Sequence, residues 1–279
     1  MSGPRVAVLL LLLALTPGVV QAGQNPVPAP APSDDADRDP NASQPDFALV
    51  NLPTTLRLPR FKSAFRVTHR FTRSLGDGDF GDLADDLFGL DNGAIIGLEY
   101  RFGLMSGLQA GLLRTSGDKT IEFFGQYNVL NQRSGDPVGL GVLVSVEGMN
   151  NFRDHHAPAF GVALSREFGE YGAVYVEPVW VHNANVLDLP GEDNSSLLIG
   201  LGARVRVRPT VYLVGEVTPR AGYSPGTHHG SFAVEKRAGG HVFQLNVSNG
   251  FGNTLGQLAR GGTSSDTWYL GFNISRKFF

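Results

Sequence analysis

The sequence predicts an all-β protein: a transmembrane antiparallel up-and-down β-barrel of about 12 strands. Two observations at opposite ends of the chain lead to this fold class. The first residues form a cleavable export signal, and the last residues form an alternating strand that ends in the aromatic Phe279. Between them, apolar residues recur with a period of two rather than 3.6. Alternating strands behind an export signal are typical of barrels in the outer membrane of Gram-negative bacteria.

Residues 1–22 predict a signal peptide. Arg5 precedes an apolar run that ends at Leu15, Pro17 follows the run, and Ala22 ends a small-residue cleavage site. The apolar run is too short to span a bilayer as a helix. The chain contains no cysteine, so neither a lipid-modified cysteine nor a disulfide can form. We therefore expect an exported protein that lies in the outer membrane.

Residues 23–46 predict a disordered linker. This stretch is rich in proline and contains an acidic cluster between Asp34 and Asp39, a composition that cannot bury a core. We expect it to lie in the periplasm as a tether, with binding of peptidoglycan or a partner protein as the alternative. The barrel domain is expected over residues 47–279, in which residues 47–61 have no assigned structure.

The net charge argues against nucleic acid as a partner. It is −3 for the full sequence and becomes −4 when Arg5 is removed with the signal peptide, whereas proteins that bind nucleic acid carry basic patches. The partners that we expect are the lipid of the outer membrane and the barrel-assembly machinery during insertion. Small solutes are the candidate cargo.

Twelve alternating segments are expected as strands, an even number as in closed bacterial barrels, although roughly 10 to 14 strands fit the pattern. With a periplasmic N-terminus, long outer loops should alternate with short inner turns. The links at 116–118 and 131–137 do not follow this rule. The expected strands are 63–71, 93–102, 108–115, 119–130, 138–147, 158–168, 173–183, 196–208, 210–217, 231–237, 241–248 and 267–279.

The two faces of these strands differ as a lipid-embedded barrel requires. In the strand at 196–208, Leu197 and Ile199 lie on one face, whereas Gly200 and Arg204 lie on the other. We expect the apolar face to contact lipid and the polar face to line the lumen. The charged residues expected in the lumen are Arg66, Arg70, Glu99, Arg101, Glu122, Glu147, Arg204, Arg206 and Arg208.

These lumen charges fit two functions. They can line a water-filled pore, or they can pair across the barrel and close it as a polar core. Inward glycines such as Gly200 and Gly202 leave room and favour the pore, and the arginines would form a positive strip that favours anions. The predicted function is a passive channel or uptake pore for small polar solutes. The alternative is a closed structural, adhesion or receptor-like barrel.

A short helix is expected in the first long loop, at residues 80–91. Phe80, Leu83, Leu87 and Phe88 recur there at helical spacing with aspartates between them. Because the first and last strands are neighbours in a closed barrel, this loop should lie beside residues 255–260. The two segments would either form a lid over one mouth or pack on the rim without a gating role.

A lipid-modifying enzyme is a less favoured alternative. Residues 246–250 (Asn-Val-Ser-Asn-Gly) resemble the His-x-Ser-Asn-Gly stretch of outer-membrane phospholipases. Asn246 stands where the histidine base would be, and asparagine cannot take a proton from Ser248. His241 lies on the opposite face of the strand. We therefore predict no catalytic residue and no enzymatic activity.

No metal site or cofactor is predicted. Two histidine pairs, His155-His156 and His228-His229, fall in loops expected on the same side of the membrane. Adjacent histidines rarely point at one ion, so solvated loop histidines are the favoured interpretation. Motifs for haem attachment, phosphate binding and metalloprotease chemistry are absent from the sequence.

Four short motifs suggest a family: residues 68–71 (THRF), 87–91 (LFGLD), 241–249 (HVFQLNVSN) and 271–278 (GFNISRKF). In these motifs the chain resembles a bacterial family of uncharacterised outer-membrane β-barrel proteins, one of the domain-of-unknown-function groups. The resemblance extends roughly over residues 50 to 279. It implies an outer-membrane barrel and no particular activity, substrate or cofactor.

Overall fold

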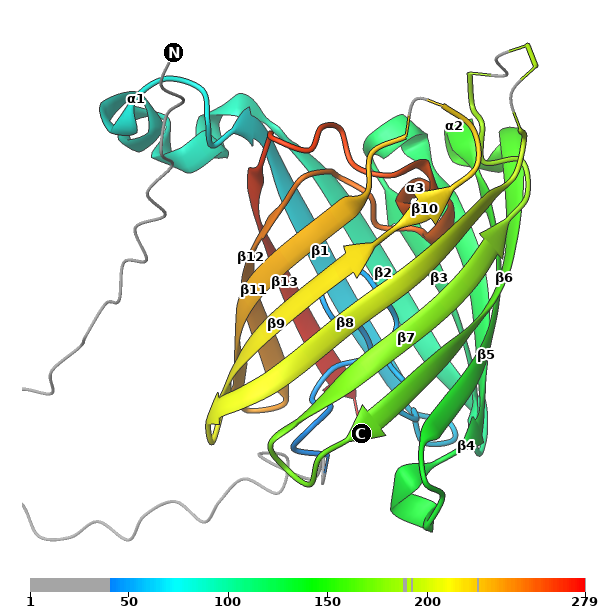
Figure 1. Ribbon diagram of the computed structural model, residues 1–279. Coiled ribbons are helices and arrows are strands. Elements are labelled where there is room, and N and C mark those ends of the chain that lie inside the picture. The colour runs from blue at the N-terminus through cyan, green and yellow to red at the C-terminus, as the bar shows by residue number, and fades with distance from the viewer. Residues whose placement is uncertain (1–40, 188–189, 192, 225, 279) are drawn as a thin grey trace, which may run out of the picture. The chain divides into compact units, whose positions relative to one another are not determined.

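The computed structural model describes residues 41–187, 190–191, 193–224 and 226–278. The predicted signal peptide and residues 23–40 of the predicted linker lie outside this part of the chain. In the described residues the strands form one antiparallel sheet that closes on itself, because β1 pairs with β13 and β8 pairs with β9. Figure 1 shows the tilted strands as a ring.

Twelve long strands make up the ring. The two-residue β10 (Arg220–Ala221) pairs with β8 beyond the end of β9. The ring strands are β1 (Ser63–Ser74), β2 (Ala94–Met105), β3 (Leu108–Thr115), β4 (Ile121–Leu130), β5 (Gly139–Gly148), β6 (Asp154–Glu167), β7 (Gly172–Val181), β8 (Ser196–Arg208), β9 (Val211–Thr218), β11 (His229–Ala238), β12 (His241–Ser248) and β13 (Tyr269–Phe278).

The predicted strands are confirmed. The bounds of β3, β8 and β12 agree with the prediction, and the largest shift is at β6, which begins at Asp154 rather than at 158. The irregular links at 116–118 and 131–137 are real and did not disturb the strand count. Strand recognition succeeded because lipid on one side and a polar interior on the other impose a period of two on every strand.

The two ends of the ring differ in their connections. At one end, which we call the turn end, the links between strands include 106–107, 209–210 and 239–240. The other end, the loop end, carries β10 and the helices α1 (Phe80–Asp85), α2 (Met149–Phe152) and α3 (Leu255–Arg260) (Figure 1). Short 3-10 helices lie at Leu87–Asn92, Gly117–Lys119 and Gln132–Ser134.

The helix predicted in the first long loop is α1, which is confirmed. Asp79 caps it, because its carboxylate accepts from the backbone nitrogens of Gly81 and Asp82. Among the described residues, no helix is both long and apolar enough to cross a membrane.

The strand faces are arranged as predicted. On β8, Leu197, Ile199 and Leu201 are exposed on the outside of the ring, whereas Leu198 and Arg204 are buried within it. The same alternation of exposed and buried residues runs along β7 and β12. The outer surface is therefore apolar, as contact with lipid requires, and the interior is polar.

The segment before β1 lies inside the ring. Residues 41–58, which we call the inserted segment, enter at the turn end and form a hairpin whose apex is residues 49–52 (Figure 1, blue). The Leu49 nitrogen donates to the Leu52 oxygen at 2.8 Å, and the Thr54 nitrogen donates to the Phe47 oxygen at 2.8 Å. Leu49, Val50 and Leu52 thereby form part of the buried core.

This position changes the predicted limits of the linker. Residues 41–46, expected to end a disordered periplasmic tether, are ordered and buried among the strands. Gln44 donates to Glu167 at 2.7 Å, and Asp46 accepts from Ser275 at 2.6 Å. Composition alone predicted disorder for these residues. The partners that order them, Glu167 and Ser275, are distant in sequence, so local composition does not reveal them.

Candidate functional site

Seven of the nine charged residues expected in the lumen are buried inside the ring. Arg206 and Arg208 are not among them, because β8 reaches the turn end at this point. Arg206 contacts Glu170 of the adjacent turn at 2.6 Å, and Arg208 is exposed. Strand β8 therefore contributes one lumen arginine rather than a strip. The seven buried residues are Arg66, Arg70, Glu99, Arg101, Glu122, Glu147 and Arg204.

The lumen is filled in this structure. Side chains that line a water-filled pore stay accessible to solvent, but Arg70 and Arg204 are 0 % exposed and Glu216 is 5 % exposed. The inserted segment and α3 account for this burial, since their backbone and side-chain atoms occupy the space in front of these residues.

The apex of the inserted segment is bound by one carboxylate. The backbone nitrogens of Val50, Asn51 and Leu52 all donate to Oε2 of Glu216, at 3.0, 3.0 and 3.1 Å. The Asn51 side-chain Nδ2 donates to Oε1 of the same residue at 2.7 Å. Hydrogen bonds to an ionised acceptor are stronger than neutral ones, so Glu216 is the main anchor of the apex.

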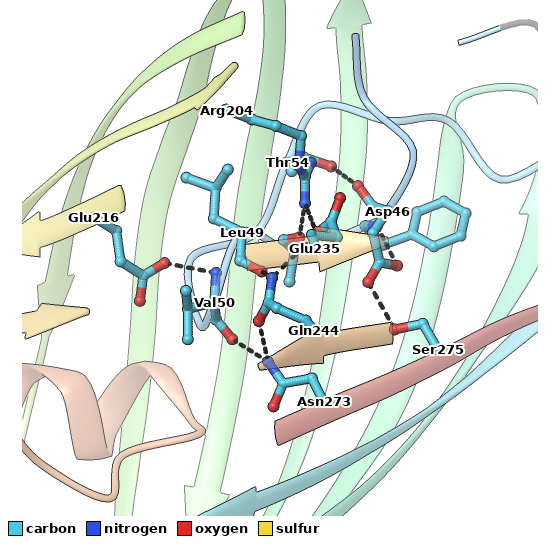
Figure 2. A network of polar contacts seen from close by, with 12 residues as sticks. Asp46, Leu49, Val50, Thr54, Arg204, Glu216, Glu235, Gln244, Asn273 and Ser275 are labelled. Atoms are coloured by element: carbon cyan, nitrogen blue, oxygen red, sulfur yellow. Dashed lines mark hydrogen bonds and ion pairs between the residues drawn. The ribbon is translucent and has the colours of Figure 1, made fainter. Parts of the chain in front are cut away.

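The carbonyl groups leading to the apex are also bound by side chains of the wall. Arg204 donates to the Ala48 oxygen at 2.7 Å and pairs with Glu235 at 3.0 Å. Gln244 donates to the Leu49 oxygen at 3.0 Å and to Glu235 at 3.1 Å. Figure 2 shows that these residues of the wall converge on the inserted segment.

Two arginines of β1 complete the contacts of the apex. Arg66 donates to the Val50 oxygen, which also accepts from Asn273 at 3.1 Å. Arg70 donates to the Asn51 side-chain oxygen at 2.9 Å and to Asn273 at 2.8 Å. These sequence-predicted lumen arginines therefore hold the inserted segment rather than face open water.

The descending leg of the hairpin is bound by amides. Gln126 donates to the Thr54 oxygen at 2.8 Å, and Asn128 donates to the Thr55 oxygen at 3.1 Å. The hydroxyl groups of Thr55 and Ser165 lie 2.5 Å apart. Uncharged polar side chains of β4 and β6 thus hold this leg.

Two inward glycines make room for the apex. A Cβ atom on Gly202 would lie 2.2 Å from a methyl group of Leu49, and one on Gly200 would lie 2.8 and 2.9 Å from the methyl groups of Leu52. The interpretation that these glycines favour an open pore is therefore wrong for this structure. Their space is taken by two leucines that the chain itself supplies.

The loop between β12 and β13 closes the lumen from the other end. Its helix α3 begins after Thr254, whose hydroxyl donates to Glu147. The Leu255 nitrogen donates to Glu122 at 3.2 Å, and Arg260 pairs with Glu147 at 2.7 Å. The predicted lumen carboxylates of β4 and β5 therefore anchor α3.

A small cavity with polar and apolar walls lies between the inserted segment and the α3 loop. Its volume is about 50 Å³, and Asn51 of the hairpin and Asn253 of the α3 loop both line it. Glu99, Arg101 and Gln126 contribute to its walls. Such a space holds no more than a few water molecules, so it is a remnant of the lumen rather than a passage.

The residues of the hypothetical lid lie elsewhere. Phe80 is 68 % exposed, Leu87 is also exposed, and Phe88 packs against Phe80 with 6.1 Å between ring centres. Leu83 is partly exposed on the same helix. Figure 1 shows α1 projecting away from the mouth. Although β1 and β13 are neighbours as expected, α3 enters the lumen and α1 does not.

The remaining candidate residues form no recognisable reactive site. Ser248 is fully buried and donates to the Gly250 oxygen at 2.7 Å. His228 accepts from the Arg220 nitrogen at 3.2 Å, and His156 contacts the Phe152 oxygen at 3.2 Å. Within the described residues, His, Asp and Glu side chains do not gather in a group of three that could hold a metal ion.

The inserted segment is the part of the lumen that the sequence did not reveal. Its apex carries apolar Leu49, Val50 and Leu52 beside a proline-rich stretch, a signal that resembles the start of a short strand. An apolar run precedes the first strand, and small residues face inward on β8. Together these two features could have suggested that a segment of the chain lies inside the barrel. No local sequence pattern indicates that residue 51 contacts Glu216.

Comparisons with known proteins agree with this architecture. The NanC porin matches with a TM-score of 0.51 at 8 % identity, over 78 % of this chain and 99 % of that chain. An outer membrane channel from Pseudomonas putida F1 matches with a TM-score of 0.49 at 15 % identity, over 79 % and 97 %. At these identities the match to NanC supports a shared fold. No curated protein sequence matches the chain.

A family model covers most of the ring. Residues 46–278 match the model described as a membrane bound beta barrel domain, DUF5777. The match begins within the inserted segment and ends within β13. The predicted membership of an uncharacterised barrel family and the closed antiparallel β-barrel are thus confirmed. The chain belongs to the membrane-bound β-barrel domain family DUF5777.

Proposed function

We propose that this protein is an outer-membrane channel for small polar solutes, closed in this structure by its own N-terminal hairpin. The observation that carries the proposal is the way residues 41–58 are held. Polar side chains of the wall donate hydrogen bonds to the backbone of this hairpin and accept them from it, in addition to the apolar packing of Leu49, Val50 and Leu52. A polar wall of this kind can be hydrated once the hairpin leaves.

The ring does not depend on the inserted segment for its hydrogen bonds. Each long strand pairs with a neighbour on both sides, and the ring closes through β8 and β9. The segment is joined to the ring at one end only, through the chain that leads into Ser63. Its withdrawal would leave a complete wall with a polar interior, which is the architecture of a water-filled barrel.

We assign the turn end to the periplasm and the loop end to the outside. Bacterial barrels have short periplasmic turns and longer outer loops. The inserted segment enters at the turn end, so residues before 41 would lie on the periplasmic side. This places the predicted tether where a periplasmic event could act on the closing segment.

The solutes that we propose are small and polar. Once the apex is withdrawn, Arg66, Arg70 and Arg204 would line the lumen together with Glu216 and Glu235, and Arg204 already pairs with Glu235. A lumen with both signs of charge selects solutes by size and by matching polar groups rather than by net charge alone. We therefore propose weaker anion preference than a strip of five arginines would give.

Deletion of residues 48–53 tests this function. The deletion joins Phe47 directly to Thr54 and removes the apex together with its contacts to Glu216 and Arg204. The chain from residue 23 is refolded in detergent, its folding is confirmed by heat-modifiable gel migration, and conductance is recorded in planar bilayers. We expect large stable steps from the deletion variant and only rare openings from the wild type.

A six-residue deletion of α1, residues 80–85, is the matched control. It removes the same number of residues from a segment outside the lumen, and we expect it to conduct no better than the wild type. A folded 48–53 deletion that stays silent would favour the alternative, a closed structural or receptor-like barrel.

A further inference from the structure

We infer that the wall around the apex is a binding site for short peptides, and that the inserted hairpin occupies it as an internal mimic of the ligand. This inference rests on the proposed function and names its solute class. The chemical class is a peptide of about four to six residues in extended or turn conformation, with apolar side chains.

The wall recognises a peptide backbone from both sides. Three consecutive carbonyl oxygens, of Ala48, Leu49 and Val50, accept from wall side chains. Three consecutive backbone nitrogens, from Val50 to Leu52, donate to the wall carboxylate of Glu216. A simple anion supplies only acceptors, whereas a peptide backbone supplies donors and acceptors in regular alternation.

The donors and acceptors of the wall come from separate strands. Arg66 lies on β1, Arg204 on β8, Glu216 on β9, Gln244 on β12 and Asn273 on β13. Each of these side chains is buried, so each was desolvated to meet the backbone of the apex. A free peptide in the same place would satisfy the same groups, which water would hydrate in the open lumen.

Side-chain recognition is present as well. Leu49 and Leu52 fill the space that Gly202 and Gly200 leave on β8. The Asn51 side chain is bound from two sides, by Glu216 at 2.7 Å and by Arg70 at 2.9 Å. The site therefore selects apolar residues at two positions and an amide between them.

The wall also contains a carboxyl group with which the hairpin forms no hydrogen bond. Glu177 of β7 is fully buried, and neither of its carboxylate oxygens has a hydrogen-bond partner in the described residues. Its Cβ lies 3.2 Å from the point where a Cβ on Gly200 would be, beside the methyl groups of Leu52. A lysine in place of that leucine in a bound peptide would bring an ammonium group to this carboxylate.

The test uses the variant that lacks residues 48–53, because a tethered apex competes at an effective concentration on the order of millimolar. The probe is the acetylated and amidated hexapeptide Ala-Leu-Val-Asn-Leu-Pro, which copies the deleted residues. We expect it to block conductance reversibly. We expect Glu216→Gln in the same variant to raise the half-blocking concentration by about tenfold or more.

A second probe separates backbone recognition from apolar adhesion. The same hexapeptide with N-methyl groups on its Val, Asn and second Leu keeps all side chains, including the Asn amide that donates to Glu216, but its three methylated backbone nitrogens cannot donate. We expect this peptide not to block conductance even at a concentration tenfold higher than that of the unmethylated peptide. The reason is the same loss of hydrogen bonds to a charged group as in Glu216→Gln. Equal block by both peptides would overturn the inference, because nonspecific adhesion of the apolar side chains would explain the block.

A lysine probe tests the part played by Glu177. We expect the hexapeptide Ala-Leu-Val-Asn-Lys-Pro to block at a lower concentration than the leucine peptide, and Glu177→Gln to abolish the gain. A lysine peptide that blocks no better than the leucine peptide would overturn this part.

The outcomes for the two proposals are distinct. A deletion variant that conducts but is blocked by none of the peptides overturns the peptide site and leaves the channel standing. A folded deletion variant that is silent overturns the channel. Binding of the fluorescently labelled hexapeptide to the silent variant is then measured by fluorescence anisotropy. Binding would support the peptide site, and the absence of binding would overturn it.

Discussion

Two segments enter the lumen, and they are held in different ways. The inserted segment, residues 41–58, is joined to the ring on one side only, and its apex is held mainly through backbone groups that donate to Glu216 and accept from Arg204. The α3 loop is fixed at both ends, between β12 and β13, and is held by Glu122 and Glu147. A segment with one attachment can leave as a unit, whereas a loop with two can only shift.

This difference suggests separate roles for the two segments. Withdrawal of the hairpin would expose the polar wall over much of the lumen, and α3 would remain as a constriction near the loop end. The hairpin would therefore decide whether the channel is open, and α3 would set how wide the open state is. The predictions below address each half of this distinction.

The largest effect is expected from Arg204. Replacing it with alanine leaves the fully buried Glu235 without its arginine partner and the Ala48 oxygen without a donor. We expect a loss of about 3–5 kcal/mol in the free energy of unfolding, measured from the temperature at which the folded gel band disappears. Arg206→Ala is the matched control on the same strand. Arg206 pairs with an exposed carboxylate, so its loss should cost no more than about 1 kcal/mol.

Glu216→Gln should open the channel in the full-length chain. The amide retains one oxygen acceptor but loses the charge that binds three backbone nitrogens and the Asn51 side chain. We expect the closed state to lose about 2–3 kcal/mol, which corresponds to roughly a 30-fold to 150-fold rise in the open-to-closed ratio. Single-channel recordings measure this ratio directly.

Glu147→Gln tests the other segment under the same conditions. It weakens the contacts of Thr254 and Arg260 with the wall but does not touch the hairpin. An open-to-closed ratio that rises as much as in Glu216→Gln would show that the two segments act as one gate.

Gly202→Ala should loosen the hairpin more gently. The added methyl group would lie 2.2 Å from Leu49, so the leucine must move within a filled core. Overpacking of this kind costs about 1–3 kcal/mol, and we expect more frequent openings. Gly215→Ala is the matched control on the neighbouring strand, because a Cβ there meets no atom within 4 Å. Equal effects of the two variants would contradict the role of Gly202.

The smallest effect is expected from Arg260→Ala in the variant that lacks residues 48–53. Arg260 is partly accessible and pairs with Glu147 at 2.7 Å, and Glu147 keeps the Thr254 hydroxyl as a donor when Arg260 is removed. If α3 sets the width of the open state, the step size should rise while the open-to-closed ratio stays the same. Bilayer recordings at several voltages distinguish the two quantities.

Much of the wall was predictable from the sequence. Alternation such as Ile199, Gly200, Leu201, Gly202 along β8 follows from lipid on one side and a polar interior on the other, and a strand carries this signal locally. The inward position of Arg66, Arg70 and Arg204 follows from the same rule. Arg206 and Arg208 were placed by alternation too, but alternation does not reveal where a strand leaves the lumen.

The contents of the lumen were not predictable in the same way. Gly200 and Gly202 indicate space, but their sequence does not tell whether water or a leucine fills it. The hairpin has no period of its own, and its anchor Glu216 lies 165 residues from Asn51. Such contacts depend on the closure of the whole ring, which no local pattern encodes.

A reversible cross-link between the hairpin and the wall tests the proposed gate most directly. Thr55→Cys and Ser165→Cys replace hydroxyl groups that are 2.5 Å apart, in a chain that has no other cysteine. The two substitutions are combined with Glu216→Gln, and Thr55→Cys with Glu216→Gln alone serves as the control. We expect the oxidised double-cysteine protein to be silent and to conduct once it is reduced. Equal conductance in both states, with the cross-link verified by mass spectrometry, would show that current does not require the hairpin to leave.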